Sequence, residues 1–272
     1  MLPKINAAFV EKLLTGFIRD ELGRHGCRKA LLGLSGGLDS AVCAALAARA
    51  LGPRNVLALV LPCGTGFRGE VRDAEGLARR LGIRCETIDI SPQIEAYFAA
   101  DPKATRLRRG NKVARERMAV LYDRSAEEGG FVLGTSNKTE LLLGYGTVYG
   151  DMACAVNPMG DLYKTQVRQL AEHLRLPAAI RRKAPTAALW PGQTDEGEIG
   201  LSYDEIDEIL YARFEGRKSR KEIVAAGHKP AAVDLVLGRV KASEFKRHLP
   251  PIAKLSPRSV GHDILHPYDW GR

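Results

Sequence analysis

The sequence predicts an α/β fold in which a mostly parallel β-sheet is covered by helices on both faces. Short strand-like runs alternate with longer stretches of helical periodicity, and this alternation is typical of βαβ units. The strand-like runs lie at residues 29–34, 55–61, 84–90 and 130–134. The helical patterns between them lie at residues 40–51, 69–81 and 111–128. Ligands of such sheets bind at the carboxyl ends of the strands, so we expect a functional site at that edge.

Further helical patterns flank these units. The N-terminal stretch predicts an amphipathic helix with Phe9, Leu13 and Phe17 on one apolar stripe, and it lacks the basic start and the cleavage site of a signal peptide. A second apolar stripe predicts a helix that ends at Pro177. Its members are Tyr163, Val167, Leu170 and Leu174. The capping-box spacing of SYDE at 202–205 begins another helix.

Two segments predict less regular structure. Residues 184–200 are rich in Pro, Gly and polar side chains, which predicts a long loop, and long loops in compact domains are often functional. Residues 91–110 predict a short helix followed by a mobile stretch. With no repeat and no clear boundary, we expect one domain over residues 1–272, with a C-terminal tail from about residue 252.

Composition narrows the class of protein. No apolar run reaches the ~18 residues that a membrane span needs, so we expect a cytoplasmic protein without a membrane partner. The five cysteines form no C-x-x-C pair and are expected to be reduced thiols, and the six histidines show no zinc-ligand spacing. The net charge is +9, with the densest basic cluster at 106–117. Because no aromatic residues interrupt that cluster, it does not predict base stacking, and we expect no nucleic-acid partner.

The loop SGGLDS at residues 35–40 is the clearest chemical signal. It joins a predicted buried strand to a helix, and such a turn leaves the first N–H groups of the helix free to bind an anion. Gly36 and Gly37 remove side chains that would keep a phosphate away from the backbone. The loop lacks the lysine of a P-loop and the G-x-G-x-x-G spacing of a dinucleotide fold. The alternative interpretation is a tight strand–helix turn with a capping serine.

The pattern S-G-G-x-D-S resembles the pyrophosphate loop of the ATP pyrophosphatase superfamily, whose members cleave ATP between its α- and β-phosphates. Asp39 beside a polyphosphate would repel it unless Mg²⁺ lay between them. The hydroxyls of Ser35 and Ser40 could donate to phosphate oxygens. The loop alone does not choose among the reactions of this superfamily.

Five further segments resemble NAD synthetases of the short, ammonia-dependent kind and stand in that family's order. They are GNKVARERM (110–118), LGTSNKTELLLGY (133–145), GDLYKTQVRQLAEHLRLP (160–177), APTAALWPGQTDEGEIGLSYDEID (184–207) and SEFKR (243–247). The resemblance extends to about residue 251. It implies a doubly wound, five-stranded sheet of the adenine nucleotide alpha hydrolase type, and a homodimer. It also implies a ligase that uses ATP and ammonia to amidate deamido-NAD through an adenylated intermediate.

The resemblance assigns roles residue by residue. It implies ATP contacts from the phosphate loop and three later residues, which are Gly33, Leu34, Ser35, Gly36, Gly37, Leu38, Asp39, Ser40, Thr135, Lys164 and Thr186. Asp39 and Glu140 would ligate Mg²⁺, and Arg115 and Lys246 would contact deamido-NAD. No catalytic nucleophile is needed, because ammonia attacks an activated carboxyl group. For Glu140, Lys164, Arg115 and Lys246 a solvated surface position is the alternative.

The chain also departs from the family pattern. Val148 stands where many short synthetases have a lysine, and Ala155 stands where they have an aspartate that touches deamido-NAD. The adjacent YGDM resembles the synthetase domain of glutamine-dependent relatives, so a separate glutaminase is an open alternative as ammonia source. The tail at 256–272 has no predicted role, and its His262, His266 and Trp270 could cover the site or a dimer interface. Rival functions are a tRNA-modifying ATP pyrophosphatase and a non-enzymatic nucleotide-binding module.

Overall fold

All four predicted strands are present and parallel in the computed structural model, which describes residues 2–186, 189–190 and 192–260. They are β1 (Ala30–Gly33), β2 (Val56–Val60), β3 (Arg84–Thr87) and β4 (Phe131–Val132). The strand order is β3-β2-β1-β4, and neighbouring strands pair with parallel register. The chain moves outward from β1 to β3 and then returns to the other side of β1. The sheet is therefore doubly wound, with its topological switch between β1 and β4.

The expected fifth strand is reduced to a single bridge between Leu133 and Val156 among the described residues, so the prediction of five strands is wrong. The N–H groups of Ala155 and Val156 both donate to the carbonyl of Val132, at 2.9 and 3.3 Å. Two successive residues bonding to one carbonyl break the alternation that a strand requires. Pro158 follows and has no N–H group to extend a ladder.

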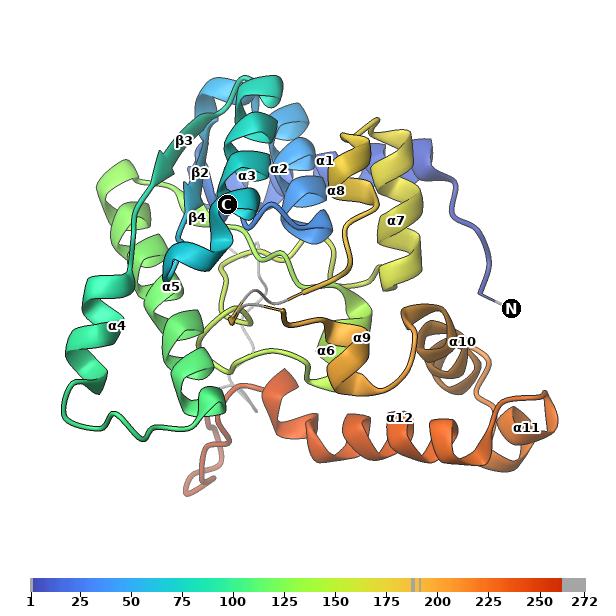
Figure 1. Ribbon diagram of the computed structural model, residues 1–272. Helices are drawn as coiled ribbons and strands as arrows, with labels where there is room; N and C mark the ends of the chain where they lie inside the picture. Colours follow the sequence, from blue (N-terminus) through green and yellow to red (C-terminus); the bar gives the residue numbers. More distant parts are fainter. Residues whose placement is uncertain (1, 187–188, 191, 261–272) are drawn as a thin grey trace.

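The two faces of the sheet carry separate cores because successive strand side chains alternate in direction. Leu32 and Ala58 pack with α1 (Ala7–Arg24), α2 (Leu38–Leu51), α3 (Arg68–Leu81), α7 (Lys164–His173) and α8 (Ala178–Arg181). Leu31 and Leu57 pack on the other side with α4 (Ser91–Phe98) and α5 (Arg106–Glu128). Figure 1 shows these two layers on either side of the strands.

A third apolar cluster lies away from the sheet. It joins α6 (Lys138–Leu143), α9 (Asp195–Ile199), α10 (Tyr203–Phe214), α11 (Arg220–Ala225) and α12 (Pro230–Ala242). In Figure 1, α10 to α12 run along one edge of the molecule, below α7. Three 3₁₀ turns complete the described elements, at η1 (Pro53–Asn55), η2 (Thr65–Phe67) and η3 (Glu244–Arg247).

Two helices differ from their predicted form. In α1 the predicted stripe faces outward, with Phe9 61% and Leu13 53% exposed, whereas α1 buries Leu14, Ile18 and Leu22 against α2 and α7. Both stripes are apolar, so periodicity could not choose between them. Helix α5 begins at Arg106, five residues before the predicted start, because the side chain of Thr105 accepts the N–H of Arg108 and caps it. The residues proposed for the tail, from His262 on, lie outside the described part.

Candidate active site

A cavity of about 500 Å³ lies at the carboxyl ends of β1, β2 and β4. Residues 33–35 and 37–40 after β1, 59–62 after β2, and 133–136 after β4 line its floor. Helix α5, residues 144–147, residues 183–186 and Lys246 close its sides. The two motifs that the sequence placed after separate strands therefore meet in one hollow, on either side of the topological switch.

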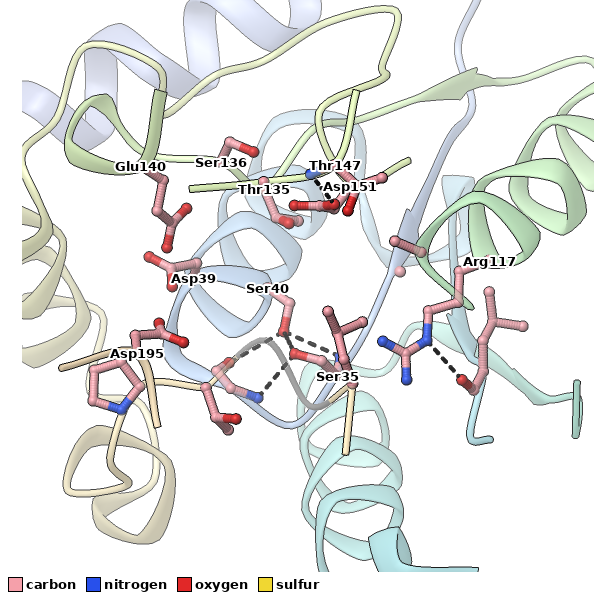
Figure 2. A pocket seen from close by; sticks show the side chains of 18 of the residues that line it. Ser35, Asp39, Ser40, Arg117, Thr135, Ser136, Glu140, Thr147, Asp151 and Asp195 are labelled. Carbon is pink, nitrogen blue, oxygen red and sulfur yellow. Dashed lines mark hydrogen bonds between the residues drawn. The ribbon is translucent and has the colours of Figure 1, made fainter. Parts of the chain in front are cut away.

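The loop at residues 35–40 is held by its own serines. The hydroxyl of Ser35 accepts the N–H of Gly37 at 3.2 Å, and the hydroxyl of Ser40 accepts the N–H of Ser35 at 3.2 Å and donates to Gly37 O at 3.1 Å. Figure 2 shows this network below the cavity. Both hydroxyls thus shape the loop through bonds to its own backbone.

The two glycines of this loop have different roles. Gly37 lines the cavity and is the N-cap of α2 without a capping side chain, so the first N–H groups of that helix are left for an anion. Gly36 does not line the cavity. Its φ is +74°, and a Cβ there would lie 2.5 Å from the carbonyl oxygen of Glu70 in α3. The glycine at 36 therefore permits a left-handed turn and close approach of α3.

Three charged side chains meet at the edge of this loop. The ammonium of Lys164 is 2% exposed, bonds to the carboxylate of Asp39, and lies 3.3 Å from Oε1 of Glu140. The side-chain amide of Asn137 donates to the other oxygen of Asp39 at 3.1 Å. Figure 2 shows the carboxylates of Asp39 and Glu140 facing one another across a short gap. Three residues that span 125 positions of the chain thus form one centre.

Each member of this centre lies in the first turn of a helix, in α2, α6 and α7. The positive end of a helix dipole favours Asp39 and Glu140 there but opposes Lys164. Burial raises the pKa of Glu140 to about 8, against the opposing effect of Lys164. Burial alone would lower the pKa of Lys164, but the carboxylates of Asp39 and Glu140 hold it above its usual value. Lys164 is therefore charged and held by its two acidic neighbours.

The same two carboxylates fit a hard divalent cation. They offer oxygen ligands that converge on one point, which the Lys164 ammonium already marks as a cation site. Within residues 2–186, 189–190 and 192–260, no group of three or more His, Cys, Asp or Glu side chains could hold a metal alone. Mg²⁺ commonly keeps waters and takes substrate phosphates as ligands, so two protein carboxylates beside a phosphate loop suit it.

The remaining predicted residues divide into two groups. Thr135, Thr186 and Lys246 line the cavity, and Lys246 Nζ donates to the carbonyls of Gly144 and Gly146 at 2.8 and 2.7 Å. Arg115 is exposed and does not line it; its Nε donates to Val148 O at 3.2 Å.

The two positions that depart from the family pattern also lie outside the cavity lining. Val148 is half-buried, and Ala155 is exposed. The structure thus gives neither side chain a contact with the described cavity.

Sequence reasoning missed several residues of the cavity wall. Arg117 lines it instead of Arg115, donates from Nε to Leu61 O at 3.0 Å, and has a pKa lowered by burial. Asp151 and Asp195 also line it, and Figure 2 shows Arg117 and Asp195 on opposite sides. Side chains that are two residues apart on a helix point in nearly opposite directions. Helical phase could therefore have shown that only one of Arg115 and Arg117 faces the cavity.

The NAD synthase family model matches residues 10–250. The chain belongs to this family. An NH(3)-dependent NAD(+) synthetase of Trichlorobacter lovleyi is 51% identical over 98% of both chains. A second one, of Chlorobaculum parvum, is 51% identical over 98% of this chain and 96% of its own. The predicted membership of the NAD synthetase family is thereby confirmed, and these comparisons give no support to a tRNA-modifying enzyme.

Solved NAD synthetases share the fold. An NH3-dependent NAD synthetase of Campylobacter jejuni is 34% identical with a TM-score of 0.79, covering 92% of this chain and 100% of its own. An NMN synthetase of Francisella tularensis is 33% identical with a TM-score of 0.82, covering 92% and 99%. A glutamine-dependent NAD+ synthetase of Acinetobacter baumannii is 29% identical with a TM-score of 0.68, and the match covers 99% of this chain but 51% of that longer one.

Proposed function

We propose that the protein is an ammonia-dependent NAD synthetase, a ligase that converts deamido-NAD, ATP and ammonia into NAD, AMP and pyrophosphate. The observation that carries this proposal is the Asp39–Lys164–Glu140 centre beside the glycine loop, in a chain whose full-length relatives bear that name. A nucleotide-binding module without chemistry would need no such convergence of buried charge.

The reaction needs activation because a carboxylate offers ammonia only oxide as a leaving group. Attack of the nicotinate carboxylate on the α-phosphate of ATP gives an acyl-adenylate and releases pyrophosphate. Ammonia then displaces AMP. The protein must hold the two substrates in line, stabilise the departing pyrophosphate and keep water from the adenylate. A cavity of about 500 Å³ on a rigid sheet edge suits these tasks.

Each residue has a task in this proposal. The loop at 33–40 and the N-terminus of α2 bind the phosphates, with Thr135 and Thr186 as further ATP contacts. Asp39 and Glu140 would hold Mg²⁺, which supplies charge neutralisation at the phosphate oxygens when bound. Lys164 adds a point charge for the pyrophosphate.

No side-chain nucleophile enters this scheme. Burial raises the pKa of Cys43 to about 12, and it also raises the pKa values of Cys63, Cys85 and Cys154. Thiols held in the protonated form are poor nucleophiles. These four thiols therefore do not suit a glutamine-cleaving step, and we propose free ammonia as the nitrogen donor.

The surroundings of the enzyme are part of the proposal. We propose that it works as a homodimer in the cytoplasm and binds deamido-NAD partly through Arg115 and Lys246. No helix among the described residues is long and apolar enough to cross a bilayer. A separately encoded glutaminase is a further partner to test, since the glutamine-dependent relative is about twice as long as the part that matches.

The test is pyrophosphate release from ATP with one acceptor at a time. Deamido-NAD should support release together with NAD formation, whereas tRNA should not. Nicotinic acid mononucleotide is the third acceptor, because one solved relative is named an NMN synthetase. Faster turnover of the mononucleotide would change the assigned substrate, and release that depends on tRNA would overturn the proposal.

A further inference from the structure

Asp207 is a fully buried carboxylate in α10 that does not line the cavity. One of its oxygens accepts the hydroxyl of Thr139 at 2.6 Å. The other accepts both the N–H and the hydroxyl of Thr165, each at 2.8 Å. Burying a charge is costly unless it is fully hydrogen-bonded, so three donors on one carboxylate indicate a specific task.

The two threonines are the direct chain neighbours of the charged centre. Thr139 precedes Glu140 in the first turn of α6, and Thr165 follows Lys164 in the first turn of α7. The hydroxyl of Thr139 also accepts the backbone N–H of Lys164 at 2.9 Å. A single carboxylate on a third helix therefore joins the two helix ends that carry Glu140 and Lys164.

Helix α10 also contacts Lys164 directly. The ring of Tyr203 lies 5.1 Å from Lys164 Nζ, and its hydroxyl donates to Asp195 at 3.1 Å. Tyr203 and Asp207 are four residues apart, so they lie on the same face of α10. That face of α10 therefore borders the ammonium of Lys164 on the side away from the cavity, while Asp39 and Glu140 hold it from the cavity side.

We propose that Asp207 is a positioning residue that holds Glu140 and Lys164 at the spacing required to receive Mg²⁺ and the phosphates of ATP. This inference rests on the proposed function. Without Asp207 the ends of α6 and α7 would keep their local structure but lose their common anchor. Supporting groups of this kind change metal affinity about 10- to 100-fold when they are removed.

The experiment measures ATP binding by titration calorimetry, with and without Mg²⁺ and in the absence of deamido-NAD. Asp207→Asn should weaken Mg²⁺-dependent ATP binding about tenfold or more, and raise the Mg²⁺ concentration for half-maximal activity similarly. The KM for deamido-NAD should change less than about twofold, since Asp207 touches no part of the cavity wall. Thermal unfolding of each variant reports whether it is folded.

A matched pair separates the hydrogen bond from packing. Thr139→Val keeps the shape but removes the hydroxyl, and should reproduce the loss; Thr139→Ser keeps the hydroxyl and should restore Mg²⁺-dependent binding. Ile209→Val in the buried face of α10 is the control for general loosening, and should lower Tm without changing the Mg²⁺ requirement. If Asp207→Asn does not fold, the threonine pair still decides.

The outcomes distinguish a failure of this inference from a failure of the proposed function. Wild-type protein that binds no ATP with Mg²⁺ would overturn the proposed function, and this inference with it. Normal wild-type binding together with an unchanged Mg²⁺ requirement in folded Asp207→Asn or Thr139→Val would overturn the positioning role alone. An Ile209→Val variant with the same raised Mg²⁺ requirement would also overturn it.

Discussion

At the scale of single residues, Lys164 occupies the point where Asp39 and Glu140 converge. Two carboxylates this close would repel one another, and the ammonium offsets that repulsion. In the proposed reaction, a bound Mg²⁺ would offer the same carboxylates more charge and would leave Lys164 available to phosphate oxygens.

Asp39→Asn should keep the fold and remove most activity. The amide preserves the shape of the side chain but loses the charge that would bind a divalent ion. Because metal-assisted charge neutralisation contributes several kcal/mol, we expect kcat to fall about a hundredfold or more. Steady-state rates at saturating substrates measure it. Asp234→Asn, which breaks an exposed pair with Arg220, should keep full activity. Near-normal turnover of Asp39→Asn would exclude Asp39 as a metal ligand.

Arg115→Ala should act mainly on deamido-NAD. Arg115 lies next to the cavity-lining segment at 144–147, where a long dinucleotide could reach it. We therefore expect the KM for deamido-NAD to rise about tenfold and the KM for ATP to stay within about twofold. Arg108→Ala on the same helix is the control. If both KM values rise together, Arg115 acts by ordering Val148 through its hydrogen bond.

At the scale of elements, apolar runs sufficed to predict β1, β2 and β4, because buried parallel strands are short and apolar. The edge strand β3 differs, since its sequence RCET mixes charged and apolar residues and is only partly buried. The charged centre was predictable only by resemblance, since Asp39, Glu140 and Lys164 are far apart in the chain. Which stripe of α1 is buried depends on α2 and α7, and the loss of the fifth strand depends on backbone bonds at Val132. Neither is encoded in a local pattern.

Gly36→Ala should destabilise the junction between the phosphate loop and α3. The new methyl group would meet the carbonyl of Glu70 at 2.5 Å, in addition to the strain of a left-handed φ. Gly129→Ala is the matched control, because its φ is +61° but nothing lies within 4 Å. Strain alone costs about 1 kcal/mol, and a backbone clash adds about 1–3 kcal/mol. Denaturant unfolding should therefore rank Gly36→Ala well below Gly129→Ala, and equal stabilities would contradict this packing role.

At the scale of the whole molecule, the proposed active site lies at the carboxyl edge of the sheet, and the three apolar clusters support that edge. The two cores fix β1 and β4 beside the switch, while the third cluster, with α10 and α12, fixes the ends of α6 and α7.

The purified chain should make NAD with ammonium salts and not with glutamine alone. Its rate with ammonium should rise from pH 7 to 9, because NH₃ rather than NH₄⁺ carries the lone pair that attacks the adenylate. The raised pKa of Glu140, about 8, acts in the same direction, since only the ionised carboxylate binds Mg²⁺, and its ionised fraction grows as pH rises through that value. Saturating Mg²⁺ removes this second effect, so the remaining slope should follow the NH₃ concentration.

NAD formation is measured with each nitrogen donor in turn. Comparable rates with glutamine, in protein free of contaminating amidase, would show that the chain has a nitrogen-releasing activity of its own.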